Sequence, residues 1–454
     1  MDPETMYTEL AASEDGDGEA ERRRRRRYYV TMATLNFFET GAGAGLTKFF
    51  PVFLASRGLD TAQVGAVLAL MQVGKFLGGL VFGRAADATG AYRGVLLWTN
   101  GAAIALALSM TSLGAPWRPF HGIARVAIVA VFASLQSFFA SSSGTLIDAI
   151  AVVNQSSGAG ADYGSLRLWA ACGWGVAALA IGGCVDAFGF SSIFIAYAAG
   201  TCFASLVVVF AFSNPERAPP TGAGAAEDRG GLWGAFLGNC VVPLYFLNFF
   251  LHGLLAAFVE SFLLLYAASR YPDAPSWFLG AMVLESALCE VPVFLYASAV
   301  LKRYGVRRCL VFAQLLFAAR CLAYAYLPAV AGESNTHGYY LFLALEPSHA
   351  ITFAMMWSAA VDYARITAPP RHQGAAQALL RGVYYYVGIG VGSYVGGRVV
   401  KAYGFQVLYK AGGAAMVGWA ALWAVLLHCA ATRDARQKAP PDPDLLLHDS
   451  ADFI

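Results

Sequence analysis

Apolar residues in this chain form long runs, which are separated by short clusters of Gly, Pro and charged residues. A helix that crosses a hydrocarbon core of about 30 Å needs around 20 mostly apolar residues, and each run reaches that length. The runs lie near residues 29–55, 61–82, 94–113, 123–152, 164–186, 191–212, 240–266, 277–300, 309–330, 339–364, 374–400 and 405–430. This pattern predicts an all-α polytopic membrane protein with twelve transmembrane helices.

A polar stretch rich in Pro, Gly and Ala, from Ser213 to Gly231, divides the twelve runs into two sets of six. The first run is too long for the apolar part of a signal peptide, so we expect it to be the first span. The predicted organisation is an N-terminal tail at 1–28, a six-helix half at 29–212, a linker at 213–239, a second six-helix half at 240–430 and a C-terminal tail at 431–454.

Short motifs recur along the chain at one offset. The loop after the second run reads GRAADATGAYR and the loop after the eighth reads SAVLKRYGVRR, which places Gly90 and Gly305 215 positions apart. The fifth and eleventh runs end at Gly189 and Gly404, again 215 apart. Two matches at one offset indicate an internal repeat. Parallel halves with polar residues at their interface are typical of alternating-access transporters.

Composition supports a membrane protein and excludes several other classes. Apolar residues make up 58% of the chain and charged residues 13%, about half the roughly 25% of soluble domains. The net charge of +2 gives no reason to expect nucleic-acid binding. The eight cysteines show neither a CxxC spacing nor a Cys/His cluster, and neither HExxH nor GxSxG occurs. We therefore expect no metal site, no cofactor apart from protons as a coupling ion, and no enzymatic activity.

The placement of basic residues predicts the orientation. With both tails on one side, that side carries 19 Lys and Arg residues and the opposite side seven, so the excess marks the cytoplasmic face. Both termini should be cytoplasmic. The tail sequences YTEL and DPDLLL are similar to sorting signals, which makes a plasma membrane or an endosomal or vacuolar membrane the expected location; a disordered solubilising tail is the alternative.

Five basic residues remain inside the spans. A charged side chain at mid-bilayer costs at least about 3 kcal/mol, so it is normally turned toward the bundle interior and paired. These residues are Lys48, Lys75, Arg167, Arg320 and Arg381.

The loop Gly83-x3-Asp87-x2-Gly90-x2-Arg93 resembles the signature of the major facilitator superfamily. The resemblance implies the major facilitator fold and a conformational gate at this loop, in which the aspartate pairs with nearby basic groups and the glycines allow close helix approach. An ordinary positively charged cytoplasmic loop is the alternative.

The fifth span, YGSLRLWAACGW, is similar to the lactose-permease-like branch of this superfamily. Arg167 and Trp174 are seven residues apart, which places them on one helix face. The resemblance implies that they hold a sugar by hydrogen bonds and ring stacking, with Asp148 as the acidic partner, although the spacing from Asp148 to Arg167 is one residue longer than in the permease. A buried structural ion pair is the alternative reading.

The resemblance continues in the second half, where Arg320 and His349 fall at the proton-coupling positions of that branch. The family's proton-carrying glutamate is replaced by Thr352, so another carboxylate must carry the proton if coupling is retained. For His349, a hydrogen-bonded interior histidine is an equal alternative. The carboxylates available within the spans are Glu260, Glu285, Glu290 and Glu346.

We favour Glu290, with Glu260 and Glu346 in reserve, because Glu290 lies in a stretch similar to a span-eight pattern of the branch. A carboxylate that moves between a desolvated site and the neighbourhood of an arginine can bind and release a proton. A movable Arg320 close to Glu290 would fit that role.

Lys48, Glu39 and Lys75 have no clear counterparts in the permease. Glu39 and Lys48 are nine residues apart, on roughly one helix face, and we expect them to line the cavity together with Lys75. This leaves room for an anionic group on the ligand. A mutual salt-bridge network is an equal alternative.

These features together predict a secondary active transporter that moves a small polar solute, a sugar or a nucleoside, by alternating access with proton symport. The alternatives are an uncoupled facilitator of a sugar or small organic anion, and a membrane receptor that does not transport. We expect the solute and membrane lipids as the partners of a monomeric chain.

Overall fold

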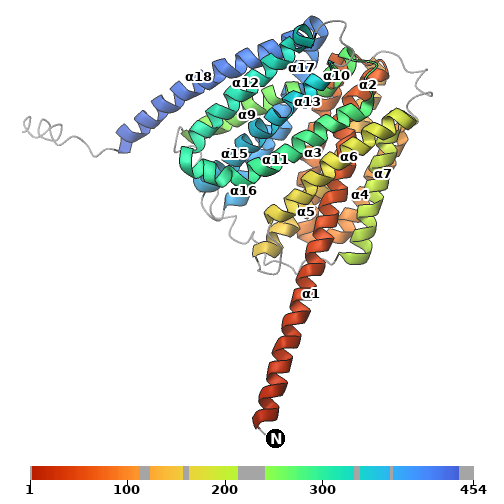
Figure 1. The fold of residues 1–454 in the computed structure, drawn as a ribbon, viewed down its shortest axis with the longest axis vertical. Helices are drawn as coiled ribbons and strands as arrows, with labels where there is room; N and C mark the ends of the chain where they lie inside the picture. Colours follow the sequence, from red (N-terminus) through yellow and green to blue (C-terminus); the bar gives the residue numbers. More distant parts are fainter. Residues whose placement is uncertain are drawn as a thin grey trace, which may run out of the picture.

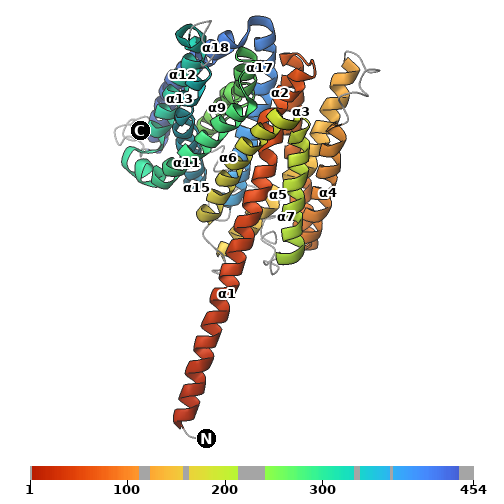
Figure 2. The same cartoon turned by 45° about the vertical axis from the view of Figure 1, so that its right-hand side comes forward.

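The computed structural model describes residues 3–111, 123–156, 163–212, 241–331, 338–368 and 372–438. Every regular element within these ranges is helical, which confirms the predicted all-α class. The helices form two groups, α1 to α7 and α9 to α18, which lie on either side of a central seam (Figure 1). The turned view separates the same two groups (Figure 2). The N-terminal part of α1 projects from one end of the bundle, here called the tail end; the opposite end is called the distal end.

The first group contains seven α-helices and one π-helical turn. Their bounds are α1 Pro3–Ala44, η1 Gly45–Phe49, α2 Phe50–Ser56, α3 Thr61–Thr89, α4 Tyr92–Thr111, α5 Ile123–Ser156, α6 Tyr163–Phe188 and α7 Ser192–Ala211.

The second group contains more broken helices. Their bounds are α9 Val241–Glu260, α10 Leu263–Arg270, α11 Ser276–Tyr304, α12 Val306–Ala331, α13 Tyr340–Leu345, α14 Pro347–Ala350, η3 Ile351–Met355, α15 Met356–Thr367, α16 Gln373–Arg381, η5 Gly382–Gly388, α17 Ile389–Tyr403 and α18 Phe405–Lys438.

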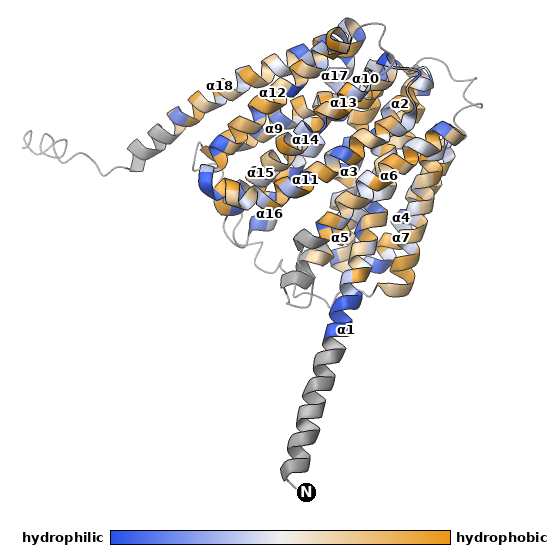
Figure 3. Cartoon of the chain, in the orientation of Figure 1, coloured by the Kyte–Doolittle hydropathy of each residue, from blue (hydrophilic) through white to orange (hydrophobic). Residues whose placement is uncertain are grey.

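Nine helices in the described ranges are long and apolar enough to cross a membrane. Apolar residues dominate the bundle, whereas hydrophilic residues mark the turns of α1 where it leaves the bundle and several helix ends (Figure 3). The other three predicted spans are the segments α1 to α2, α13 to α15 and α16 to α17, and each is interrupted by a π-helical turn. π-Helical turns occur frequently at functional sites. Here η1 carries Lys48, η5 directly follows Arg381, and η3 begins two residues after His349.

Backbone geometry repeats between the two groups. Gly90 and Gly305 have φ of 69° and 80°, and Gly189 and Gly404 have φ of 79° and 83°, so glycines with positive φ end equivalent helices at the offset of 215. Only glycine adopts this conformation without a steric cost. The repeat read from the sequence is thus reproduced in the helix ends.

One side-chain contact repeats in the same way. Arg93 donates to the carbonyl oxygen of Val209 at 2.6 Å, and Arg307 donates to the carbonyl oxygen of Ala424 at 3.0 Å. Each arginine lies just after a loop glycine and satisfies a carbonyl near the tail end of the last helix in its own group. Val209 lies in the last turn of α7, where an arginine is also favoured by the helix dipole.

The two groups are joined at the distal end. Asp60 begins α3 with a capping box, in which its side chain accepts from the N–H of Gln63 at 2.9 Å, and the same carboxylate lies 2.7 Å from Nζ of Lys401 on α17. Asp186 on α6 accepts from the backbone N–H groups of Ser276 and Trp277 on α11, at 2.6 and 2.9 Å. Close packing of α3 on α17 and of α6 on α11 therefore closes this end.

Candidate functional site

A buried group of ionisable residues links the two halves, and we call it the charge cluster. Lys48 in η1 donates from Nζ to Oε2 of Glu260 on α9 at 2.5 Å, an ion pair across the seam. The other oxygen of Glu260 lies 3.5 Å from Nε2 of His349. The members of the cluster are Lys48, Glu260, Glu290, Arg320, Tyr324, Glu346 and His349.

Arg320 is the most fully satisfied member of the charge cluster. Its guanidinium donates to the hydroxyl of Tyr324 at 3.0 Å and lies 3.3 Å from both carboxylate oxygens of Glu346. The Tyr324 hydroxyl in turn donates to Glu346 at 2.6 Å. The expected neighbour of Arg320 was Glu290, but the carboxylate that binds it here is Glu346.

The contacts of His349 fix which of its nitrogens carries a proton. Nδ1 lies 2.9 Å from a guanidinium nitrogen of Arg320, which has only N–H donors, so Nδ1 must accept. The proton of the neutral ring therefore lies on Nε2, which is 3.4 Å from Glu290 and 3.5 Å from Glu260. His349 thus connects Arg320 to the two carboxylates at the seam.

The cluster contains more carboxylates than permanent cations. The cluster holds three carboxylates, Glu260, Glu290 and Glu346, and two permanent cations, Lys48 and Arg320. His349 is neutral because its Nδ1 accepts a hydrogen bond from Arg320. Glu260 and Glu346 each contact a cation, whereas the contact of Glu290 in the described part of the chain is the imidazole. One added proton would make the cluster neutral, and Glu290 is the carboxylate that can accept it with the least loss of ion pairing.

Thr352 occupies the position at which the resemblance would place a glutamate. Its hydroxyl donates to the backbone carbonyl of His349 at 3.0 Å, and the side chain is buried. Thr352 therefore supports the helix at the start of η3 and offers no group that titrates.

A second charged group lies nearer the tail end and contains Asp148, Arg167 and Arg381; we call it the Asp148 site. Oδ1 of Asp148 on α5 lies 3.8 Å from Arg167 on α6, and Oδ2 lies 3.3 Å from Arg381 at the end of α16. The side chains of Arg167 and Arg381 are 52% and 40% exposed, so the seam is accessible beside them. One carboxylate thus receives an arginine from each half.

Trp174 and Lys75 complete the residues expected to bind the solute. Trp174 is partly buried on α6, and its ring comes within 3.9 Å of a β-carbon placed on Gly43 of α1. Lys75 is partly buried on α3 and makes no ion pair or hydrogen bond with any residue that the structure describes. Arg167 therefore has an acidic partner, Asp148, whereas Lys75 has none in the described part of the chain.

Glu39 and Lys48 are not neighbours, in contrast to their expected shared face. Glu39 accepts from the side-chain amide of Asn100 on α4 at 2.7 Å, and Asn100 also bonds to Ser143 and Ser205 at 2.6 and 3.1 Å. The carboxylate lies in a polar network inside the first half, whereas Lys48 crosses to Glu260. A separation of nine residues is about two and a half turns of an α-helix, so the two side chains leave the helix on nearly opposite sides and the expected shared face is wrong.

The predicted gate loop lies at the tail end of α3. Gly83 is within α3, Gly90 ends the helix, and Asp87 accepts from the hydroxyl of Tyr92 at 2.6 Å. Arg93 holds the end of α7, as described above. The loop therefore connects α3, α4 and α7 within the first half.

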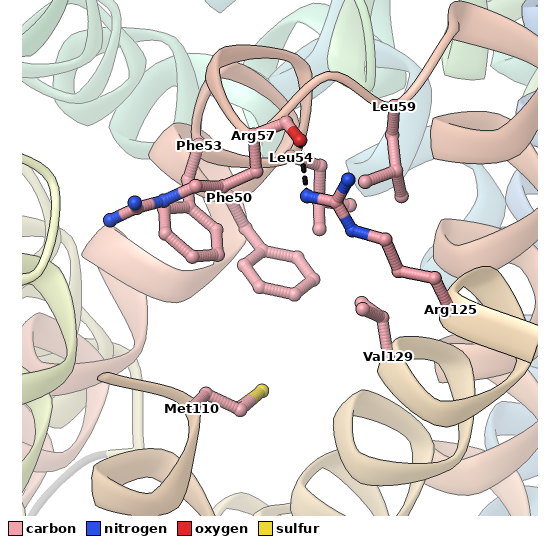
Figure 4. Close-up of a pocket in the computed structure, with 8 residues that line it drawn as sticks. All are labelled: Phe50, Phe53, Leu54, Arg57, Leu59, Met110, Arg125 and Val129. Atoms are coloured by element: carbon pink, nitrogen blue, oxygen red, sulfur yellow. Dashed lines mark hydrogen bonds between the residues drawn. The ribbon is translucent and has the colours of Figure 1, made fainter. Parts of the chain in front are cut away.

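A small apolar pocket lies elsewhere, at the distal end of the first half (Figure 4). Arg125 on α5 donates to the backbone carbonyl of Arg57 at its rim. The pocket contains none of the ionisable residues of the seam. Its lining residues are Phe50, Phe53, Leu54, Arg57, Leu59, Met110, Arg125 and Val129.

Two features of the site were missed by sequence reasoning. Tyr324 follows Arg320 by four residues, so helical spacing alone could have indicated their contact. The pair of Asp60 and Lys401 carries no such signal, because its members are 341 positions apart and come together only when the halves pack.

Comparison with known proteins gives consistent similarities. Residues 29–411 match the model of the MFS_1 like family. The chain is 28% identical to maltose permease of Geobacillus stearothermophilus over 386 residues, which cover 83% of this chain and 88% of that permease.

Solved structures show the same fold. The structure of a variant of the nucleoside transporter NupG superposes with a TM-score of 0.74 at 16% identity, covering 88% of this chain and 99% of that one. A peptide transporter POT in complex with alafosfalin superposes with a TM-score of 0.64 at 13% identity, covering 88% and 94%. At these identities the likeness concerns the arrangement of helices alone.

Proposed function

The chain belongs to the MFS_1 like family of membrane transporters, and from this premise we propose that it is a proton-coupled symporter of a sugar or a related hydroxylated solute. It is a multi-pass membrane protein that carries a small molecule, and it is not an enzyme. The single observation that carries the coupling proposal is the composition of the charge cluster. The three carboxylates and two permanent cations of this cluster need one proton for neutrality.

The Asp148 site supports a hydroxylated solute. A carboxylate that accepts hydrogen bonds and an arginine fork that donates them can bind two vicinal hydroxyls, and an indole face beside them can stack on a pyranose or a base. The similarity to a maltose permease favours a sugar. We assign binding to Asp148, Arg167 and Trp174, with Lys75 and Lys48 at the edge of the same seam.

The coupling step follows from the two connections of the charge cluster. Lys48 belongs to the first half and Glu260 to the second, so separation of the halves at this level breaks their ion pair and leaves Glu260 to His349. A proton on Glu290 lowers the cost of that separation, because the second half, which keeps Arg320, then carries one uncompensated carboxylate charge in the low dielectric in place of two. Arg320 and Glu346 lie on the second half and move together. Proton binding at Glu290 thereby favours one orientation of the carrier.

The distal end is closed, whereas the arginines of the Asp148 site are accessible nearer the tail end. We propose that this arrangement is the inward-facing state of a monomer, because the count of Lys and Arg assigns the tail end to the cytoplasm. The loop of Gly83, Asp87, Gly90 and Arg93 would gate that end.

The test is transport by the full chain in proteoliposomes with an internal pH dye and a panel of sugars and nucleosides. Symport predicts that solute entry acidifies the interior, and that Glu290→Gln abolishes uphill uptake while exchange of labelled for unlabelled solute continues. Glu285→Gln on the same helix is the control and should retain uphill uptake.

The uncoupled facilitator remains the second candidate, supported by Thr352. Uptake that is insensitive to a collapsed proton gradient, with Glu290→Gln indistinguishable from the parent, would favour it. Binding without flux in either assay would favour a receptor.

A further inference from the structure

The direction of the Lys75 side chain follows from the two faces by which α3 packs on its neighbours. Gly74 and Gly78 pack against the α5 backbone at Ser134 and Phe138. On another side of α3, Gln72 lies against Gly390 of α17, and the ring of Phe76 lies 5.6 Å from that of Tyr386.

The angle between successive residues on a helix is about 100°, so Lys75 lies midway between the face on α5 and the face on α17 and η5. The opposite side of α3 carries Val73 and Leu77, which are 51% and 47% exposed. The ammonium of Lys75 therefore points toward the seam, whereas Val73 and Leu77 point away from it.

Lys75 differs from the other cations within the spans. Lys48, Arg167, Arg320 and Arg381 each pair with a carboxylate. For Lys75, the described ranges contain no acidic side chain within 4.0 Å and no hydrogen-bond acceptor. An ammonium group without a partner is costly at this depth in the membrane. An anionic group on a ligand in the seam would supply the missing partner of Lys75.

The charges on the same side of the seam as Lys75 are mostly positive. A β-carbon placed on Gly79, one turn beyond Lys75, would lie 3.4 Å from the hydroxyl oxygen of Thr145 on α5, and Asp148 follows Thr145 by one turn. Lys75 is thus about two turns, or about 11 Å, to the distal side of Asp148 along the helices. At that level Asp148 is already shared by two arginines. This side of the seam carries three cations and one carboxylate.

From this arrangement, and resting on the proposed function, we infer that the transported solute is a sugar acid: a hydroxylated ring bound at Asp148 and Arg167, with a carboxylate or phosphate group that binds to Lys75. The distance between Asp148 and Lys75 along the helices separates the part of the site that would bind hydroxyls from the part that would bind the anionic group. A neutral sugar would occupy the first and leave Lys75 unpaired.

The test is thermal unfolding of the purified full chain, because a ligand that binds only the folded state raises Tm with its concentration. The probes are glucose, maltose, glucuronate, glucose 6-phosphate and inorganic phosphate. We expect glucuronate or glucose 6-phosphate to bind at least about tenfold more tightly than glucose. Lys75→Gln should remove that preference, Lys75→Arg should retain most of it, and Lys410→Gln, an exposed lysine at the distal end, should leave it unchanged.

Three results would overturn the inference: acids that bind no better than neutral sugars, a Lys75→Gln variant that weakens both classes equally, or inorganic phosphate that binds as tightly as the sugar acids. A parallel flux assay separates the two proposals. Proton-coupled uptake of neutral sugars without acid preference would remove this inference alone, whereas acid binding without flux would support the inference and reject the transport proposal.

Discussion

Arg381 of the second half reaches across the seam and lies 3.3 Å from the carboxylate of Asp148 in the first half. Its counterpart in the internal repeat, Arg167, lies 3.8 Å from the same carboxylate within the first half. In the second half the equivalent aspartate, Asp362, pairs instead with Arg365 at 2.7 Å. The repeat is therefore broken at this site, and one carboxylate serves both halves.

The ion pair of Asp148 and Arg381 should contribute little to stability but should compete with the solute for Asp148. In a double-mutant cycle of Asp148→Asn and Arg381→Gln, we expect a coupling energy below about 1 kcal/mol for thermal stability, because both side chains are partly exposed. Solute should compete with the bridge, so Arg381→Gln should increase solute affinity several-fold. Scintillation proximity binding measures this effect. Weaker binding by Arg381→Gln would instead assign Arg381 to the solute site.

Arg167→Lys should reduce transport at least about tenfold with normal expression and membrane insertion. Lysine keeps the charge but cannot donate two parallel hydrogen bonds from one planar group. Initial rates of uptake in proteoliposomes give the comparison. Arg57→Lys, at the distal pocket, is the matched control, and normal transport by Arg167→Lys would remove Arg167 from the solute site.

The ion pair of Lys48 and Glu260 predicts asymmetric costs. Lys48→Gln leaves a carboxylate without its cation in a low dielectric, for which a loss of about 3 to 5 kcal/mol is typical of a buried pair. We expect poor expression and a lower Tm for this variant. The double variant Lys48→Gln with Glu260→Gln should recover stability, because it removes the cation and its carboxylate together. A double variant as unstable as Lys48→Gln would show that the lysine contributes by packing.

The general fold was readable from the sequence because it depends on local properties. Apolar length gave the spans, and glycines at 215-residue spacing gave the repeat, which reappears in the positive φ of Gly90 and Gly305. Asp148 and Arg167 were paired by resemblance and lie together.

Partners across the seam could not be read in the same way. Lys48 and Glu260 are separated by 212 positions, and their contact depends on how two finished halves pack. Arg320 binds Glu346 and not Glu290, although both carboxylates belong to the second half, and no helical periodicity encodes which of the two the arginine reaches. The polar network of Glu39 was missed because its partner Asn100 is 61 positions away on another helix, and because nine residues place Lys48 on nearly the opposite side of the helix from Glu39.

The seal at the distal end should depend on pH. Burial opposes ionisation of Asp60, but hydrogen bonds from Lys401 and from backbone N–H groups, together with the charge of Lys401, outweigh it and lower the pKa of Asp60 below its ordinary value of 3.8. A lowered folded-state pKa means that the stabilisation is fully present above the unfolded value and is lost as the pH falls through the folded value. The seal is therefore intact at neutral pH.

Asp60→Asn at pH 7 should reproduce the acid-weakened seal. Labelling of a cysteine introduced at Thr61 with a membrane-impermeant maleimide should be faster in this variant, and Asp273→Asn, at the same end, should have no effect. Unchanged labelling would show that packing of α3 on α17 closes the end without the ion pair.

Tyr324→Phe provides the sharpest test of the charge cluster, because it removes one oxygen and no charge. That hydroxyl donates to Glu346 at 2.6 Å and accepts from Arg320 at 3.0 Å, and each loss leaves a buried polar group short of a partner, at about 1 to 3 kcal/mol. We expect a lower Tm and, because Arg320 is then held less firmly against Glu346, a changed pH dependence of uphill uptake while solute exchange is retained. Tyr326→Phe, on the exposed side of the same helix, should match the parent in both assays. A lower Tm with an unchanged pH profile would assign Tyr324 to packing and separate it from proton transfer, since a purely structural loss affects stability but leaves the protonation equilibrium at Glu290 and His349 as it was.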